Sequence, residues 1–267
     1  MANVSLSSSV RQNLLAMQAT NDMMTITQNR LATGKRVNSA LDNATNYFTS
    51  SALQGRASDL SNLLDSISNA TKTIEAANNG IEGIKKLVES AQSIARQVKA
   101  GGDATSLDVE YQKILTQIDE LASDSGYNGI NLIKGTADEL TVDFNEDGSS
   151  TLAVTGVDLD SAGLAISGTD VTDADEAEAS LDALAAALTT LRTTASTLGS
   201  NLSTIQARQN FTKSMVATLK GGADNLVNAD INEEAATLLA LQTRSQLSQT
   251  ALSMSNQQDQ SVLRLFS

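Results

Sequence analysis

One short stretch of the sequence has the spacing of a metal-binding loop. Asp143-x-Asn145-x-Asp147-Gly148 matches the first six positions of a calcium loop, in which oxygen atoms of alternate residues surround the cation. The twelfth position, where such a loop supplies a bidentate glutamate, is Val154. Because that ligand is missing, we interpret the stretch as an acidic hairpin turn and predict no metal site.

The rest of the composition excludes most kinds of catalytic and cofactor site. The chain has no His and no Cys, which removes thiol nucleophiles, zinc and haem sites built on these ligands, and the usual general base at neutral pH. Gly34-Lys35 lacks the earlier glycine of a phosphate-binding loop. Carboxylates adjacent in sequence, such as Glu233-Glu234, point to different parts of a helix surface. We therefore predict no catalytic residue and no cofactor, and an enzyme is the weakest functional class.

The net charge of −13 comes from one segment of the chain. Residues 1–134 hold 12 basic and 13 acidic side chains, and residues 192–267 hold 6 and 5. Residues 135–191 hold 13 acidic side chains and no basic one. Two nearly neutral arms can associate closely, whereas the acidic segment repels copies of itself and nucleic acid. We expect this segment to lie in solvent.

Membranes and nucleic acids are not expected partners. The longest apolar run, Ala183–Leu188, has six residues and is too short to span a bilayer. The first residues, Met1–Ser5, have neither a basic nor an apolar region, so we predict no cleaved secretory signal. Aromatic residues make up only 3% of the chain, which leaves no stacking platform for nucleic acid.

Two regions carry a seven-residue repeat that is typical of long packed helices. The first region, 53–98, has apolar residues at Leu53, Leu60, Ile67, Ile74, Ile81, Val88 and Ala95, with a second row three residues behind. This pattern predicts a helix that ends at Gly101-Gly102. A shorter helix should follow, with Thr105 and Asp108 as its capping box, and end near Ser125. The repeat returns from Leu181 to Leu226, where Gly221-Gly222 should weaken the helix.

The segment between the repeats reads as a hairpin. Leu140–Phe144 and Thr151–Val154 alternate as strands do, and Asp147-Gly148 can form the turn between them. Seven of the 16 glycines fall in 126–168. We therefore expect an irregular, exposed region around the hairpin.

The two ends of the chain are amphipathic and lack polar caps. Residues 1–32 carry a thin apolar stripe, and a further helix should start after Asp230 with Glu233 as its capping-box partner. A monomeric bundle accounts for the two repeat regions, but it leaves the apolar faces of 1–32 and 232–267 uncovered. The simplest physical solution is that the ends pair with each other and bury their remaining apolar surface against neighbouring copies. This arrangement makes a polymer.

The sequence resembles the bacterial flagellins, the filament subunits of the flagellum. Residues 31–40, LATGKRVNSA, followed by Asp42-Asn43-Ala44, are similar to the family's Leu-Ser-Ser-Gly-x-Arg-Ile-Asn-Ser-Ala and Asp-Asp-Ala. Tyr127-Asn128-Gly129 resembles its Phe-Asn-Gly turn, and residues 224–266 resemble its C-terminal signature almost throughout. The resemblance covers roughly four fifths of the chain. The chain lacks the large variable outer domains of long flagellins, which implies a thin and comparatively smooth filament.

The resemblance implies a mainly α fold, a long antiparallel coiled-coil or helical bundle rod with a small β-hairpin region. We expect an N-terminal core helix and connector (1–43), the N-terminal part of a helical rod domain (44–134), an acidic hairpin and outer segment (135–172), the C-terminal part of the rod (173–223), and a C-terminal connector and core helix (224–267). The terminal helices would line the filament core as an antiparallel coiled coil.

The site residues expected from this interpretation form two sets. The polymerisation core is predicted to contain Val10, Met17, Met24, Leu31, Leu238, Leu241, Leu247, Leu252, Leu263, Leu265 and Phe266. The connector between core and rod is predicted to be shaped by Gly34, Arg36, Asn38, Ser39 and Asp42. The implied partners are other copies of the chain, a flagellar export chaperone, and cap and hook-associated proteins. The implied location is the extracellular filament, reached through the flagellar type III apparatus.

Two alternatives stay open at this point. A hook-associated protein of the hook–filament junction shares the terminal architecture. A membrane-active helical translocator would also have amphipathic ends, but it should carry basic residues along the polar face, and residues 1–32 contain only Arg11 and Arg30. The filament subunit is the preferred interpretation because the whole C-terminal signature is present.

Overall fold

The computed structural model describes residues 8–265, and the side chains of all of these except Ser9, Asp259 and residues 262–265. The elements in chain order are α1 (Ser8–Thr33), α2 (Ala44–Lys99), α3 (Ala104–Asp124), β1 (Glu139–Asp143), β2 (Thr151–Thr155), α4 (Ala174–Val227) and α5 (Ile231–Leu265). The chain divides into two compact units, 1–55 with 219–267 (unit 1) and 56–218 (unit 2). The mainly α fold with a small hairpin is thus confirmed.

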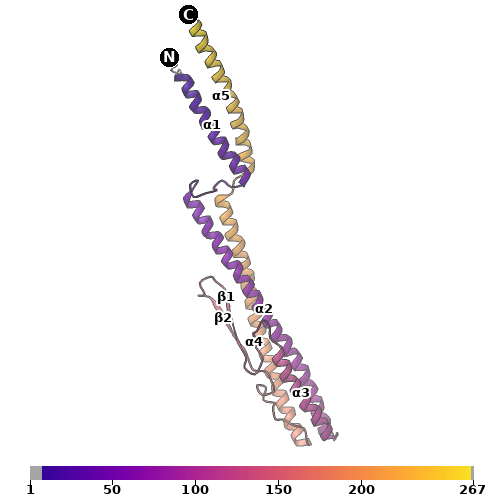
Figure 1. Cartoon of the computed structure of the whole chain (residues 1–267). Coiled ribbons are helices and arrows are strands. Elements are labelled where there is room, and N and C mark those ends of the chain that lie inside the picture. The colour runs from indigo at the N-terminus through magenta and orange to yellow at the C-terminus, as the bar shows by residue number, and fades with distance from the viewer. Residues whose placement is uncertain (1–7, 266–267) are drawn as a thin grey trace. The chain divides into compact units, whose positions relative to one another are not determined.

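Unit 1 is built on the pairing of the two end helices. Helices α1 and α5 run side by side and antiparallel (Figure 1), and they pack against each other along their length. The first turns of α2 and the last turns of α4 complete the unit. Residues more than 200 positions apart in the sequence therefore meet in this unit.

Unit 2 contains the main hydrophobic core. The remaining parts of α2 and α4 and the whole of α3 contribute apolar side chains that are almost inaccessible to water. On α2 these recur at every seventh position, as Leu60, Ile67, Ile74, Ile81, Val88 and Ala95. The predicted helix over 53–98 is confirmed, although it begins earlier, at Ala44. A fully buried Leu or Ile contributes about 1.5–3 kcal/mol, so this repeat stabilises the unit strongly.

The ends of two helices differ from the predictions. Helix α3 begins at Ala104, so its N-cap is Asp103, and the predicted capping box of Thr105 and Asp108 is wrong. Oδ1 of Asp108 instead accepts the N–H of Val171 at 3.1 Å, which ties α3 to the segment before α4. Helix α4 continues through Gly221 and Gly222 to Val227 without a break. Helix α2 stops at the predicted place, where Gly101 takes a φ of +92°.

The hairpin forms in the predicted place. Strands β1 and β2 pair antiparallel, with Glu139 opposite Thr155 and Asp143 opposite Thr151. Gly148 has a φ of +68° in the turn, a conformation that glycine adopts without strain. The oxygens of Asn145 and Asp147 accept the N–H groups of Ser150 and Ser149, so they serve the turn. The interpretation as an acidic hairpin turn accounts for all of these bonds.

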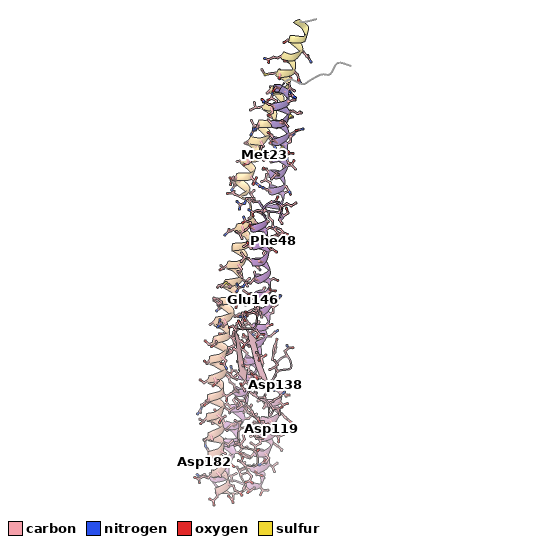
Figure 2. All side chains as sticks on the ribbon, turned by 90° about the vertical axis from the view of Figure 1, so that its left-hand side faces the viewer. Met23, Phe48, Asp119, Asp138, Glu146 and Asp182 are labelled. Carbon is pink, nitrogen blue, oxygen red and sulfur yellow. The ribbon has the colours of Figure 1, made fainter. Side chains whose placement is uncertain are left out.

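The acidic segment around the hairpin is more ordered than the glycine content predicts. Most of its large apolar side chains are buried in the core of unit 2; they are Leu140, Val142, Phe144, Val154, Leu159, Leu164, Ile166 and Val171. Its acidic side chains alternate with these and are mostly exposed, and Figure 2 shows Asp138, Glu146 and Asp182 in this unit. The expectation of an irregular, exposed region is therefore wrong for the apolar half of the segment. The expectation that the acidic side chains of this segment lie in solvent is confirmed for most of them.

Candidate functional site

The predicted stripe of α1 faces α5. Val10 is buried, and Met17, Met24 and Leu31 are half-buried at successive intervals of seven residues. On α5, Leu238, Leu241 and Leu252 lie on the face toward α1; Leu241 is buried and the other two are half-buried. The structure thus brings these members of the predicted polymerisation core together in one seam between two antiparallel helices.

Polar residues fill the second row of this seam, and the apolar pattern of the sequence did not predict them. Thr20 and Thr27 on α1 are buried, as is Ser245 on α5. The hydroxyl of Thr20 donates to the carbonyl of Ala16 at 2.7 Å, so its polar atom is satisfied within α1. Burial of such a hydroxyl is tolerated only when it is hydrogen-bonded. The signal that could have found this row is its spacing, because Thr20 and Thr27 lie three residues behind Met17 and Met24.

Other predicted core residues lie elsewhere. Leu247 is on α5 but is 66% exposed, so it does not take part in the seam with α1. Leu239 and Met254 are exposed to a similar degree, at 66% and 60%. Phe266 and the side chains of Leu263 and Leu265 lie outside the described residues.

An ion pair joins the two helices near the connector, which is the chain of residues 34–43 between α1 and α2. Nη1 of Arg30 on α1 lies 2.9 Å from Oε1 of Glu234 on α5, and the side chain of Glu234 is only 12% exposed. The sequence does not predict this pair, because periodicity shows which face of a helix is buried and not which residue lies opposite. Helix α5 begins one residue after Asp230, whose Oδ1 accepts the N–H groups of Asn232 and Glu233, as its predicted N-cap should.

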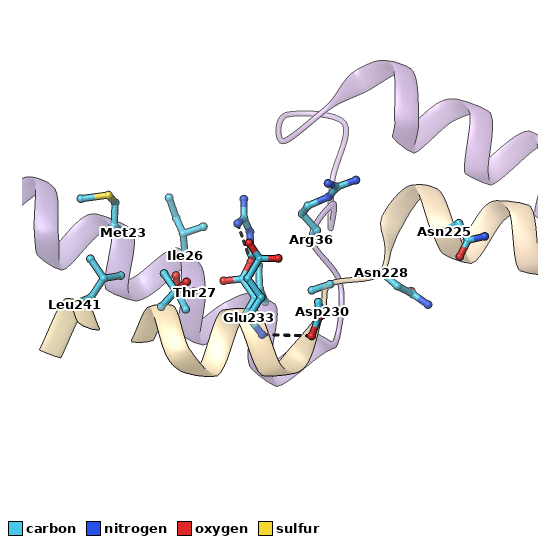
Figure 3. A pocket seen from close by; sticks show the side chains of 13 residues that line it. Met23, Ile26, Thr27, Arg36, Asn225, Asn228, Asp230, Glu233 and Leu241 are labelled. Carbon is cyan, nitrogen blue, oxygen red and sulfur yellow. Dashed lines mark hydrogen bonds and ion pairs between the residues drawn. The ribbon is translucent and has the colours of Figure 1, made fainter. Parts of the chain in front are cut away.

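A groove opens beside this ion pair, between α1, the connector and the start of α5 (Figure 3). We call it the connector groove; its volume is about 600 Å³, and its lining residues include Met23, Ile26, Arg30, Arg36, Asp230, Glu233, Glu234 and Leu241. Met23 and Ile26 are 40% and 51% exposed along one side. The groove therefore offers apolar side chains and charges of both signs to a further binding partner.

The connector is shaped by hydrogen bonds to one carboxylate. Oδ2 of Asp42 accepts the N–H groups of Asn38 and Ser39, both at 2.9 Å, and the hydroxyl of Ser39 at 3.3 Å. The amide of Asn38 donates to the carbonyl of Lys35 at 3.3 Å. The bonds from the backbone of Ser39 and Asn38 lower the pKa of Asp42 below its ordinary value.

The start of the connector pairs with the chain between α4 and α5. Gly34 has a φ of +67°, and its carbonyl accepts the N–H of Ala229 at 3.0 Å. The backbone N–H of Arg36 donates to the carbonyl of Val227 at 2.7 Å, and the side chain of Arg36 lines the connector groove. This backbone ladder fixes the end of α1 beside the start of α5.

Within residues 8–265, no cluster of three or more acidic side chains is placed to hold a metal ion. None of the helices in the described part of the chain has an apolar stretch long enough to cross a bilayer. What the site offers is an antiparallel helix pair with exposed apolar residues and a groove at its base.

The chain matches two protein-family models, and the matches cover both repeat regions. Residues 4–138 match the bacterial flagellin N-terminal helical region, and residues 181–266 match the bacterial flagellin C-terminal helical region. The chain is 31% identical to a protein named flagellin FljM from Caulobacter vibrioides, over 95% of each chain. It is 30% identical to a flagellin from Brucella melitensis, over 100% of this chain and 99% of the relative. A solved structure of Bacillus cereus flagellin has 21% identity and a TM-score of 0.49, with 57% of this chain and 88% of that chain covered.

Proposed function

The chain belongs to the bacterial flagellin family and is a structural subunit of the flagellar filament, and we propose that its paired end helices are the part through which copies assemble. The filament is the extracellular part of the flagellum. The matched relatives are named flagellin, and the matches cover nearly their whole length. This does not favour the alternative of a hook-associated junction protein.

The distribution of exposed apolar side chains supports assembly through unit 1. Of the fifteen large apolar side chains that are exposed in the described structure, eleven lie in unit 1, although it is the smaller unit. Large exposed apolar patches mark surfaces that other molecules cover. This concentration of apolar surface is the observation that carries the proposal.

Helix α5 supports the same conclusion because it is apolar on two sides. One side faces α1, and the other bears Leu239, Leu247 and Met254 at intervals of eight and seven residues, which places the three on a common face. Between Glu234 and Asp259 the helix has a single charged residue, Arg244. A neighbouring copy can therefore pack on the outer face without burying charge. Leu247 and the residues Leu263, Leu265 and Phe266 keep their predicted role in assembly.

Finer aspects of the function follow from the family and are part of the proposal. The subunit performs no catalysis, and it leaves the cell through the flagellar export apparatus with the help of a chaperone. At the tip it meets cap proteins, and at the base it meets hook-associated proteins. The absence of Cys suits a chain that must refold far from the cell without disulfide chemistry.

Truncation tests whether the ends drive assembly. Removal of residues 262–267 should abolish polymerisation, because it deletes four large apolar side chains worth about 1.5–3 kcal/mol each when buried. The helix content of unit 2 should be unchanged by circular dichroism. Electron microscopy of the purified subunit after addition of salt should show filaments for the full chain and none for the truncated one. Normal filaments from the truncated subunit would contradict the proposal.

A further inference from the structure

We propose that the connector groove of one copy receives residues 262–266 from the end of α5 of a second copy. This inference rests on the proposed function, since it names which part of one copy meets which part of the next. It gives the filament a contact between two different surfaces of the same chain.

The groove has the size and character of a site for a few side chains. Its volume of about 600 Å³ lies within the range of about 300–1,000 Å³ that is usual for binding pockets. Ile26 and Met23 expose about half of their surface along one side, and Leu241 is buried at the base. An apolar segment that covered these side chains would remove them from water.

Residues 261–267 have the matching chemistry. The segment SVLRLFS contains four large apolar residues and one charge, Arg264. The groove is lined by two basic and three acidic side chains, which gives it a net charge of −1. Arg30 pairs with Glu234, whereas the exposed carboxylate of Glu233 has no ion pair within residues 8–265. Arg264 of an incoming segment can therefore pair with Glu233.

The segment must come from another copy. The groove lies at the start of α5, and residues 262–265 lie at the other end of the same helix. A helix of 35 residues is about 50 Å long, so a chain cannot place its own last residues in its own groove. A contact between two different surfaces of identical copies forms a ring if the rotation between copies closes. If the rotation does not close, the contact extends into a fibre. This is the kind of contact that a filament needs.

A charge exchange tests the pairing. Glu233→Arg and Arg264→Glu should each slow polymerisation, measured by light scattering, by about tenfold or more, as the loss of a close interfacial charge pair does. The double variant should return to within a few-fold of the original rate. Glu233→Arg combined with Arg244→Glu is the matched control, since Arg244 lies on the same helix outside the groove, and it should not recover. Single variants that polymerise normally, or a double variant no faster than the singles, would overturn the inference.

Cross-linking gives a second and independent measurement. The chain has no Cys, so introduced cysteines report only on the chosen pair. Ile26→Cys subunits mixed with Leu265→Cys subunits should give a covalent dimer under mild oxidation in filaments, and Ile26→Cys subunits alone should give none. Mixed filaments without the dimer would overturn the inference while leaving the proposed function intact. Failure of the unaltered subunit to form filaments would instead contradict the proposed function.

Discussion

Arg30 and Glu234 form an ion pair that solvent reaches only in part, with 33% and 12% of the two side chains exposed. Glu234→Gln leaves the charge of Arg30 without its partner, which should weaken the seam between α1 and α5 by about 1–2 kcal/mol after allowance for exposure. The concentration of free subunit in equilibrium with filaments should then rise about 5- to 30-fold.

Sedimentation of filaments at several total concentrations measures this change. Glu89→Gln is the matched control, because Glu89 pairs with Lys85 at 3.9 Å on the exposed surface of α2 and should contribute less than about 0.5 kcal/mol. Equal effects of the two variants would show that the pair in the seam has no special role.

Asp42 makes the connector sensitive to acid. Its folded-state pKa is lowered by hydrogen bonds from the backbone N–H groups of Ser39 and Asn38. Because the folded-state pKa is lowered, the ionised carboxylate stabilises the connector fully at pH values above about 3.9, the ordinary pKa of an Asp side chain. This contribution is lost as the pH falls below that value and through the folded-state pKa. The amide NMR signals of Asn38 and Ser39 should titrate together below pH of about 3.9. Titration of these signals at or above that pH would contradict the assignment.

Single residues differ in how far the sequence could identify them. Met17 and Met24 were predictable because their spacing of seven shows on which face of a helix they lie. The partners Arg30 and Glu234 were not, because they are 204 positions apart and periodicity carries no information about the facing helix. Thr20 and Thr27 were missed because a polar residue type is ordinarily expected in solvent.

At the scale of elements, close contact between α2 and the chain that follows α3 depends on a glycine. A Cβ added at Gly80 would clash with Oγ of Ser125 and would lie 2.6 Å from Cδ1 of Ile133. Gly80→Ala should therefore lower the free energy of unfolding by about 1–3 kcal/mol, as overpacked cores do. Gly199→Ala on α4 is the control; no atom lies within 4 Å of its added Cβ, and the change should stabilise the helix by about 0.5–1 kcal/mol. Urea unfolding of the monomeric subunit distinguishes the two, and a stabilised Gly80→Ala variant would refute the packing argument.

The seam of α1 and α5 should be the less stable helix pairing in the free subunit. Its buried positions include Thr20, Thr27 and Ser245, whereas the matching heptad positions of α2 are buried Leu, Ile, Val and Ala residues. Elements that bury little apolar surface open at low free energy. Amides of α1 and α5 should therefore exchange hydrogen faster than those of residues 67–98 in the monomer, and they should become protected in filaments. Equal protection of both regions in the monomer would contradict the idea that the ends are completed by neighbouring copies.

The elements themselves were largely predictable, and their ends were not. The heptad rows located α2 and α4 because a buried stripe requires that spacing over many turns. Helix α4 continues past Gly221 and Gly222 because Leu219, Ala223 and Val227 around them are buried, and their packing outweighs a cost of about 1 kcal/mol for each glycine. The predicted cap of α3 was wrong because several polar residues near the start of the helix could serve as its N-cap. Asp108 is used instead in a tertiary hydrogen bond, which the local sequence does not show.

For the whole molecule, the sequence predicts where charge and exposed apolar surface accumulate better than it predicts packing. The alternation in β1 leaves Glu139 and Asp143 exposed and buries Leu140 and Val142. Apolar residues at every second position indicate that one face of the strand is buried. They do not show that this face packs into the core of a helical unit. The acidic side chains are thus concentrated in unit 2, and the exposed apolar side chains are concentrated in unit 1.

This separation predicts how assembly responds to salt. Residues 135–191 carry 13 acidic side chains and no basic one, so neighbouring copies repel each other there while apolar burial draws the ends together. Polymerisation should accelerate as salt rises, because the Debye length falls from about 30 Å at 0.01 M to about 3 Å at 1 M. A triple variant with Glu139→Gln, Asp143→Asn and Asp182→Asn should polymerise faster than the original at 0.01 M and equally fast at 1 M. Filaments that dissolve on addition of salt near neutral pH, or a triple variant with unchanged salt dependence, would show that this repulsion does not govern assembly.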